Sequence, residues 1–339
     1  MDGKTNESSK KDSRLRISNK DKLLILVLEN KSIILLIAIM ILAQIVSGGI
    51  FLRGANLSSV LRQTAVTSIM ALGYVFVLTC GMIDLSTGHM LSFCGIVYTQ
   101  VSFIAPIPVA IIVALVAGLL AGLFNGLLSI KLNLTPFILT LGTAQIFRGL
   151  AYLLCGGISI NITDNFMKFL GQGLLFGFLP MTVLFVIVIT IVVAIVINRT
   201  KYGRHVIATG GNMEAARVSG VNISKTKITA FVIMGFLISI ASIVLTGRVA
   251  IAMPNGGQGM EMDAIAAVII GGTSLSGGKA NVIGAIFGAL ILGVISNLLN
   301  LAGVSSFWQW FFKGIIIVVA VLLDTTTEKI FQKRQLMAS

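Results

Sequence analysis

The sequence predicts an all-α integral membrane protein with about ten transmembrane helices. Of its 339 residues, 56% are hydrophobic and only 11% are charged, whereas about 25% of the residues in an ordinary soluble domain carry a charge. The mean hydropathy is +1.00. A soluble core could not bury this much apolar surface, so a disordered chain, a collagen-like chain and a free-standing nucleic-acid binder are poor interpretations. The formal charge of +13 therefore needs an explanation that involves a membrane.

Hydrophobic windows long enough to cross a bilayer follow one another along the chain, since a spanning helix needs roughly 20 mostly apolar residues. The segment 262–275 is less hydrophobic and is either a tenth crossing or a re-entrant segment. We therefore divide the chain into a basic tail (1–31), a transmembrane domain (32–324) and a C-terminal tail (325–339). The other nine windows are residues 33–52, 64–80, 89–105, 108–130, 137–155, 180–198, 228–247, 281–301 and 307–323.

The distribution of Lys and Arg predicts the orientation, because these residues accumulate on the cytoplasmic side of short loops. The tail 1–31 carries eight of them and precedes an apolar run too long for a secretory signal, so we expect an uncleaved first span. With ten crossings, the basic loop 199–227 and both chain ends lie in the cytoplasm. The segments 156–180 and 250–259, which are poor in basic residues, then lie outside.

Motifs of enzymes and metal sites are missing from the sequence. The run GGTSLSGGKA (271–280) resembles a phosphate-binding loop but lacks one of its glycines and its final Ser or Thr. The chain has only two His, and its three Cys show no C-x-x-C spacing. We therefore predict that the chain is not an enzyme, that it binds no metal, cofactor or nucleic acid, and that its cysteines are small buried hydrophobes.

Glycine is expected to have two different roles. Gly118, Gly122 and Gly126 lie at four-residue spacing, which lets membrane helices approach closely. The motifs GMIDLSTG (81–88) and GGTSLSGG (271–278) share the pattern G-x-x-x-L-S-x-G, and each precedes an apolar window. They are either traces of two related halves, as in many transporters, or a chance match. The glycines of the second motif should break or bend a helix.

Polar and charged side chains in apolar segments are the candidate pathway residues, because burying them in hydrocarbon costs free energy. Snorkelling or pairing at the ends of spans is the alternative explanation for most of the charged ones. No span carries a ladder of titratable groups, which favours a neutral polar solute over an ion-coupled mechanism. The ionisable candidates are Arg62, Asp84, Arg148, Arg248, Glu261 and Asp263. The residues assigned to the pathway or its gating are Asp84, Ser86, Asn125, Thr273, Ser274, Gly277, Gly278 and Asn297.

The basic loop 199–227 contains a short predicted helix. Asn212 is a suitable N-cap, Glu214 lies in the first turn beside the positive helix end, and Gly220 stands where a C′ glycine belongs. A helix of about two turns is marginal on its own in water. It must therefore bind in a groove of a partner or lie on the inner surface of this protein.

At this helix the sequence resembles a known family. The pattern E-A-A-x-x-x-G at 214–220 matches permease subunits of ATP-binding-cassette importers. Longer segments resemble the permeases of ribose-type sugar importers, in the branched-chain/ribose permease family, and the similarity covers nearly the whole chain after the tail. Met82 is a departure, since the family usually has a second glycine there. The segments are GMIDLSTG (81–88), PFILTLGTAQIFRGLAYLLCGG (136–157), YGRHVIATGGNMEAARVSGVN (202–222) and MDAIAAVIIGGTSLSGGKANVIGAIFGALILG (262–293).

The resemblance implies a type II importer-like permease in the bacterial cytoplasmic (inner) membrane. ATPase subunits, which carry ATP and Mg, would dock on the short helix, and a sugar-binding protein would deliver substrate from outside. A second copy of the permease would complete the pathway within the lipid. The residues that the resemblance places at the ATPase-coupling helix are Gly203, Arg204, Asn212, Glu214, Ala215, Ala216, Arg217 and Gly220.

The resemblance favours ribose as the substrate. Xylose, galactose and a furanosyl quorum signal remain alternatives within the same class. An ion-coupled secondary transporter that works alone is a less favoured alternative from another class, and a non-transporting scaffold or receptor is a third.

Overall fold

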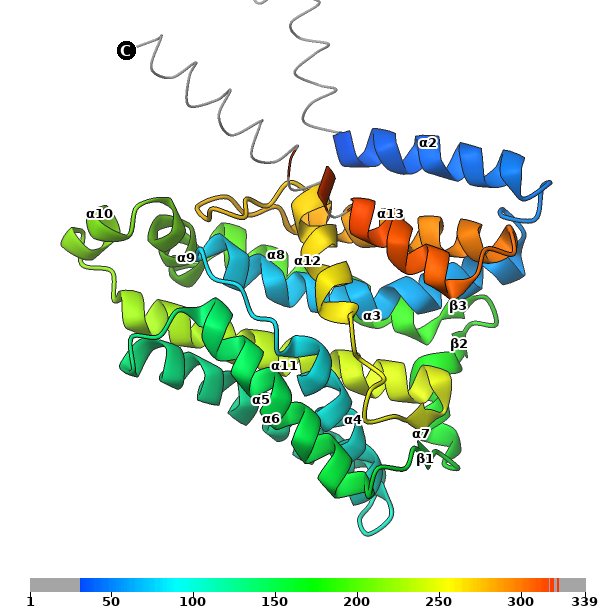
Figure 1. The fold of residues 1–339 in the computed structure, drawn as a ribbon, viewed down its shortest axis with the longest axis horizontal. Helices are drawn as coiled ribbons and strands as arrows, with labels where there is room; N and C mark the ends of the chain where they lie inside the picture. Colours follow the sequence, from blue (N-terminus) through cyan, green and yellow to red (C-terminus); the bar gives the residue numbers. More distant parts are fainter. Residues whose placement is uncertain (1–30, 317, 320–321, 323–339) are drawn as a thin grey trace, which may run out of the picture.

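The computed structural model describes residues 31–316, 318–319 and 322, and most of these are helical (Figure 1). The predicted tails therefore lie outside the described residues, apart from Lys31 at the start of the first helix. Residues 306–316 form a further helical segment after α13. The helices are α2 (Lys31–Val46), α3 (Gly54–Thr79), α4 (Thr87–Ser102), α5 (Ile107–Lys131), α6 (Pro136–Cys155), α7 (Asn165–Gln172), α8 (Met181–Arg199), α9 (Lys201–Gly211), α10 (Met213–Val218), α11 (Ile223–Val249), α12 (Met260–Ile270) and α13 (Val282–Leu301).

Six of the described helices are long and apolar enough to cross a membrane, namely α3, α5, α6, α8, α11 and α13. The expected count of about ten crossings is not confirmed. Helices α2 and α4 have 16 residues each, which is short of the roughly 20 that a crossing requires. Helix α12 has only 11 residues, and at 1.5 Å per residue it covers about half of a hydrocarbon core that is about 30 Å thick.

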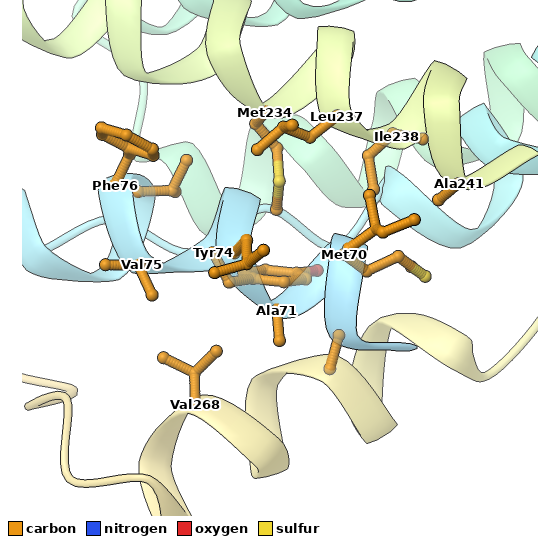
Figure 2. Close-up of a cluster of buried hydrophobic side chains, with 14 of the residues drawn as sticks. Met70, Ala71, Tyr74, Val75, Phe76, Met234, Leu237, Ile238, Ala241 and Val268 are labelled. Atoms are coloured by element: carbon orange, nitrogen blue, oxygen red, sulfur yellow. The ribbon is translucent and has the colours of Figure 1, made fainter. Parts of the chain in front are cut away.

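Helix α3 forms the centre of the bundle. Of its most apolar 18-residue window, 78% is buried, against 17% for α8. Figure 2 shows its side chains Met70, Ala71 and Tyr74 between α11 on one side and α12 on the other. A helix that is buried on all sides is a core helix. The helices around it therefore carry the surfaces that face lipid or partners.

The glycines spaced by four residues in α5 do mediate close helix packing, as predicted. A Cβ atom added to Gly118 would collide with the carbonyl oxygen of Gly235 in α11, and one added to Gly122 would collide with that of Phe231. A Cβ at Gly126 would come within 3.1 Å of the Ile228 Cα. Helices α5 and α11 thus touch backbone to backbone over more than two turns.

The predicted break at the second glycine motif is also confirmed. Helix α12 ends at Ile270 and α13 begins only at Val282. Gly272, Gly277 and Gly278 have φ angles of +89°, +92° and +76°, which non-glycine residues rarely adopt.

The two ends of the bundle differ in structure (Figure 1). One end carries α9 and α10, and the opposite end carries α7 and four short strands. The strands pair as two antiparallel ribbons, with Ile160 opposite Ala252 and Leu174 opposite Pro180. They are a small correction to the all-α prediction, and they form because the connections at this end satisfy their backbone groups by pairing with each other. Their bounds are β1 (Ile160–Asn161), β2 (Leu174–Leu175), β3 (Leu179–Pro180) and β4 (Ile251–Ala252).

We predict that Gly122→Ala lowers the free energy of unfolding by roughly 1–3 kcal/mol, because the added methyl group forces α5 and α11 apart. Reversible unfolding of the purified protein in detergent micelles measures the change. Gly142→Ala in α6 is the matched control, since no atom lies within 4 Å of its added Cβ. Equal stability of the two variants would contradict this account of the α5–α11 contact.

Candidate functional site

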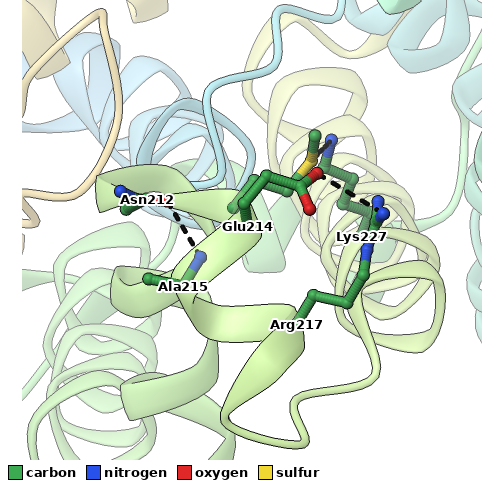
Figure 3. Close-up of polar contacts among 6 residues, drawn as sticks. Asn212, Glu214, Ala215, Arg217 and Lys227 are labelled. Atoms are coloured by element: carbon green, nitrogen blue, oxygen red, sulfur yellow. Dashed lines mark hydrogen bonds and ion pairs between the residues drawn. The ribbon is translucent and has the colours of Figure 1, made fainter.

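The short helix predicted in the basic loop is α10, and its start is capped as expected (Figure 3). The side-chain Oδ1 of Asn212 accepts a hydrogen bond from the backbone N–H of Ala215 at 2.9 Å. Asn212 itself is in extended conformation, with φ −154° and ψ 102°. This geometry is typical of an N-cap residue, which satisfies one of the free N–H groups of the first turn.

The end of α10 is fixed by Gly220. Its φ of +84° is in the left-handed region. The N–H of Gly220 donates to the carbonyl of Arg217 at 3.0 Å, and the N–H of Val221 donates to that of Ala216 at 3.0 Å. These two bonds form a Schellman motif, which needs glycine at C′. The helix therefore has defined stops at both ends, although it is only six residues long.

Helix α10 projects from the bundle with most of its side chains uncovered. Val218 is 87% exposed and Met213 is 39% exposed, whereas Ala216 is buried against the protein at 5%. Ala215 is exposed, and Glu214 forms an exposed ion pair with Arg217 at 3.4 Å. Exposed pairs of this kind contribute little stability. The helix thus leaves apolar side chains and a weakly held charge pair uncovered.

A groove of about 670 Å³ lies beside α10, between it and the connection from α5 to α6. Arg217 and Lys227 contribute positive charge to its wall, and Ser129 and Asn133 contribute polar groups from the other side. The Lys227 Nζ also contacts the Met213 sulfur at 3.5 Å (Figure 3). The groove extends the exposed surface of α10 toward α5.

Helix α9 joins α8 to α10 and was not predicted, because three glycines in 11 residues disfavour a helix in isolation. Thr200 caps it, with its Oγ1 accepting from the N–H of Gly203 at 3.1 Å. A Cβ at Gly203 would collide with the carbonyl oxygens of Val196 and Ile197, so glycine is required there. Arg204 points outward and is exposed. Of the predicted coupling residues, Gly203 therefore positions α9, and Arg204 lies on its surface.

Asp84, Ser86 and Asn125 meet in one fully buried cluster. The Ser86 N–H and Oγ donate to Asp84 Oδ1 at 2.8 and 2.6 Å, and Asn125 Nδ2 donates to Ser86 Oγ at 2.8 Å. The carboxylate also lies just before α4, whose N-terminus favours negative charge. The N–H of Leu85 donates to Thr140 Oγ1 at 3.0 Å. The cluster thus fixes the start of α4 against α5 and α6.

The remaining pathway candidates lie elsewhere and are bound to their own surroundings. Thr273 is buried, and its Oγ1 accepts from the N–H of Asn281 at 3.0 Å. Ser274 Oγ accepts from the N–H of Ser276 at 3.2 Å. Asn297 on α13 exchanges two hydrogen bonds with Asn56 on α3, at 3.0 and 2.9 Å. The structure brings Asp84, Ser86 and Asn125 together, whereas Thr273, Ser274 and Asn297 bond to other partners; of the glycine candidates in the loop, Gly277 lies against Gly81, three residues before Asp84.

The structure also reveals two exposed polar side chains on α6 that were not assigned to the pathway. Helix α6 exposes Gln145 and Arg148 near its middle, and the Arg148 guanidinium lies 5.9 Å from the centre of the Tyr152 ring. The signal in the sequence was the isolated Arg148 within an apolar window. Its spacing from Gln145 places both residues on one helix face, which an inspection of each residue by itself does not reveal.

A second group of charges lies close by, where α4 and α12 begin. A Cβ added to Gly88 would collide with the Glu261 carboxylate, and His89 is the next residue in α4. One turn further along α4, Phe93 stacks on Phe147 of α6, the neighbour of Arg148, with ring centroids 5.9 Å apart. On α12, Asp263 forms an ion pair of 2.7 Å with Lys313 in the helical segment after α13. Ionisable groups from α4, α6 and α12 therefore gather in one region of the bundle.

A bundle of apolar helices with a projecting, capped helix at one end is the architecture of a multi-pass membrane protein. The chain belongs to the family described as "branched-chain amino acid transport system / permease component", whose model matches residues 56–321. This family consists of transport permease subunits, and the multi-pass prediction agrees with it. No solved structure matches the chain.

Proteins similar to this chain include ribose and xylose permeases. The chain is 41% identical over 278 residues to the ribose import permease protein RbsC of Bacillus subtilis (strain 168), covering 81% of this chain and 86% of that protein. It is 37% identical over 302 residues to RbsC of Escherichia coli (strain K12), covering 88% and 94%. It is 33% identical over 356 residues to the xylose transport system permease protein XylH of the same strain, covering 87% and 91%.

We predict that Asn56 and Asn297 are energetically coupled, because removing either amide leaves the other without its partner between α3 and α13. In a double-mutant cycle with Asn56→Leu and Asn297→Leu, the unfolding free energies should show a coupling of roughly 0.6–1.7 kcal/mol. The matched control pairs Asn56→Leu with Asn300→Leu, because Asn300 bonds to Gln309 instead. Additive effects of the substitutions at 56 and 297 would mean that the two amides have no interaction energy.

Proposed function

We propose that this chain is the membrane-spanning permease of an ATP-driven importer that carries ribose into a bacterial cell. The observation that carries the proposal is its similarity, over 81% and 88% of its length, to two ribose import permeases. The exposed surface of α10 supports it, because a capped helix with Val218 at 87% exposure is suited to a protein partner. That partner is an ATPase subunit, which binds ATP and Mg and supplies the energy.

The two different ends of the bundle support an assignment of sides. The end with α9 and α10 is then cytoplasmic, together with both chain termini, and Arg199, Lys201 and Arg204 provide the basic residues expected there. The opposite end, with α7 and the paired strands, faces outward and receives a sugar-binding protein. Ten crossings remain our proposal, in which α2, α4, α12 and the helical segment after α13 add to the six long helices.

The exposed face of α6 supports a pathway between two copies of the permease. Gln145 and Arg148 would be costly in contact with lipid tails. Irregular or polar surface at membrane depth is tolerated where it faces protein or a water-filled cavity. A homodimer in which the two α6 faces enclose the pathway would satisfy these residues, and amide and guanidinium groups can bind sugar hydroxyls.

The ionisable groups at the starts of α4 and α12 would extend this polar surface. The Glu261 Oε2 and the His89 Nδ1 are buried atoms without a hydrogen-bond partner among the described residues. Such atoms carry unused capacity to bind a polar solute or water. Asp84, Ser86 and Asn125 would affect the pathway indirectly, because they fix the start of α4.

Xylose is the second candidate substrate. The specific observation in its favour is the 33% identity to a xylose permease over 87% of the chain. Galactose or a furanosyl signal would require the same class of pathway. An ion-coupled transporter is less favoured, because no described span carries a series of titratable groups along its length.

The proposal predicts ATP-dependent uptake of radiolabelled ribose into proteoliposomes that contain this chain, its ATPase and a ribose-loaded binding protein. Glu214→Ala and Gly220→Ala should reduce uptake and co-purification of the ATPase, because they remove the charge pair and the C′ glycine of α10. Asn198→Ala, an exposed amide at the end of α8, is the control and should leave both unchanged.

Uptake of xylose in place of ribose would support the assignment to an ATP-driven importer and would identify xylose as its substrate. Gradient-driven uptake by the permease alone, without ATPase, would favour the ion-coupled alternative.

The pathway assignment predicts that a cysteine at position 145 reacts with a charged, membrane-impermeant thiol reagent in the assembled importer. Ribose should slow this reaction, since the side chain would line the sugar's route. Ile191→Cys on α8 is the control, because it is 54% exposed on an apolar face and should meet lipid. The experiment uses a chain whose native Cys80, Cys94 and Cys155 have been replaced. Labelling of both positions, or of neither, would contradict the assignment.

A further inference from the structure

Three segments that are far apart in the sequence meet at the end of the bundle that carries α9 and α10. They are the end of α3, the end of α9 and the loop between α12 and α13. The N–H of Gly278 in that loop donates to the carbonyl of Thr79, the last residue of α3, at 2.9 Å. Gly210 of α9 lies against both of these residues. We call this meeting point, formed by Thr79, Gly81, Gly210, Gly277 and Gly278, the glycine junction.

The glycine junction leaves little or no space for a Cβ atom at Gly210, Gly277 and Gly278, whereas one at Gly81 would make an ordinary contact. A Cβ at Gly210 would collide with the Thr79 carbonyl oxygen and come within 2.5 Å of the Gly278 nitrogen. A Cβ at Gly277 would come within 3.0 Å of the Gly210 oxygen and of the Gly81 nitrogen. Gly81 and Gly277 also have φ angles of +73° and +92°. The three segments therefore touch through their backbones, and one cannot slide past another without breaking the contact.

Each segment of the junction leads directly to a part of the proposed transport machinery. Gly210 is followed by Gly211 and by Asn212, the N-cap of α10. Gly81 stands three residues before Asp84, whose cluster fixes the start of α4. The loop of Gly278 continues to α13.

The part of that loop next to α13 is also fixed by hydrogen bonds. Asn281 caps α13 through a bond from the Gly284 N–H at 2.8 Å and donates to the Gly271 carbonyl, at the end of α12, at 2.8 Å. The junction thus connects α10 to the ends of four membrane helices.

We propose that the glycine junction is the joint through which movement of α10 reaches the two irregular segments that precede α4 and α13. The proposal rests on the proposed function, in which an ATPase displaces α10. A displaced α10 carries Gly210 with it, and Gly210 carries Thr79 and Gly278, because no flexible side chain lies between them. The two G-x-x-x-L-S-x-G motifs are then two sides of one joint. Gly210, Gly277 and Gly278 are positioning residues and need not touch sugar.

The test compares Gly210→Ala with Gly211→Ala in the complete importer. The two residues are neighbours at the end of α9, but a Cβ at Gly211 comes only to 3.8 Å from the Gly278 Cα, which is an ordinary contact. Neither glycine has a positive φ, so alanine suits the local backbone in both. We expect Gly210→Ala to raise the ATP hydrolysed per ribose imported by about tenfold, a typical size for coupling between two sites. Gly211→Ala should stay close to the unsubstituted protein.

The ratio separates coupling from folding. Misfolding removes active importers and lowers hydrolysis and uptake together, whereas a broken joint lowers uptake and spares hydrolysis. A normal ratio in Gly210→Ala, with the unsubstituted importer active, overturns the joint and leaves the proposed function standing. An unsubstituted importer that shows no ATP-dependent uptake of any sugar overturns both.

A second measurement avoids substitutions in the packed contact, in case Gly210→Ala does not accumulate. Spin labels are placed at the exposed positions His205 on α9, away from the proposed docking surface of α10, and Ser276 in the loop, in a chain without its native cysteines. The distance between the labels is measured by pulsed electron spin resonance in the nucleotide-free and ATP-bound importer. The joint predicts the same distance in both states, because the labelled segments move as one body. A distance that changes between the states overturns the proposal.

Discussion

Direct contact between backbones is the constraint on which the rest of this structure depends. Lipid tails are as apolar as leucine, so membrane helices gain little by burying leucine against each other and rely on close packing instead. Glycine supplies that packing between α5 and α11, where Gly122 lies against Phe231, and between α3, α9 and the loop after α12. The first contact holds α5 and α11 together. The second joins the end of α3 to α9, which leads into the exposed helix α10.

Local signals in the sequence were sufficient for the elements that depend on local chemistry. The caps of α10 at Asn212 and Gly220, the break before α13 and the glycine face of α5 were all predicted, because each rests on residues within a few positions of one another. Helix α9 was missed, since its glycines are explained only by the backbones packed against them. The pairing of Asn297 with Asn56 could not be predicted, because the two residues lie 241 positions apart in the chain.

The candidate site shows the same difference between features that depend on nearby residues and features that depend on distant ones. Asp84, Ser86 and Asn125 could each be singled out as costly in hydrocarbon, but their meeting depends on how α4 packs on α5. Arg148 was visible as a charge within an apolar window, whereas its place on the exposed face of α6 beside Gln145 needed the burial of the surrounding helix. The length of α2 was overestimated and that of α12 was left open, because hydropathy does not show where a turn ends a helix.

The burial of α3 has a consequence for how the chain is made. Together with α6, it is the least apolar of the six long helices, and its polar residues include Arg62, Gln63 and Thr64. The helices that enclose it, α11, α12 and α13, are synthesised long after it leaves the ribosome. During that interval α3 must remain in contact with lipid or with the insertion machinery, which suits it poorly. The centre of the bundle is therefore completed last, and nascent chains cut short before α11 would leave their core helix uncovered.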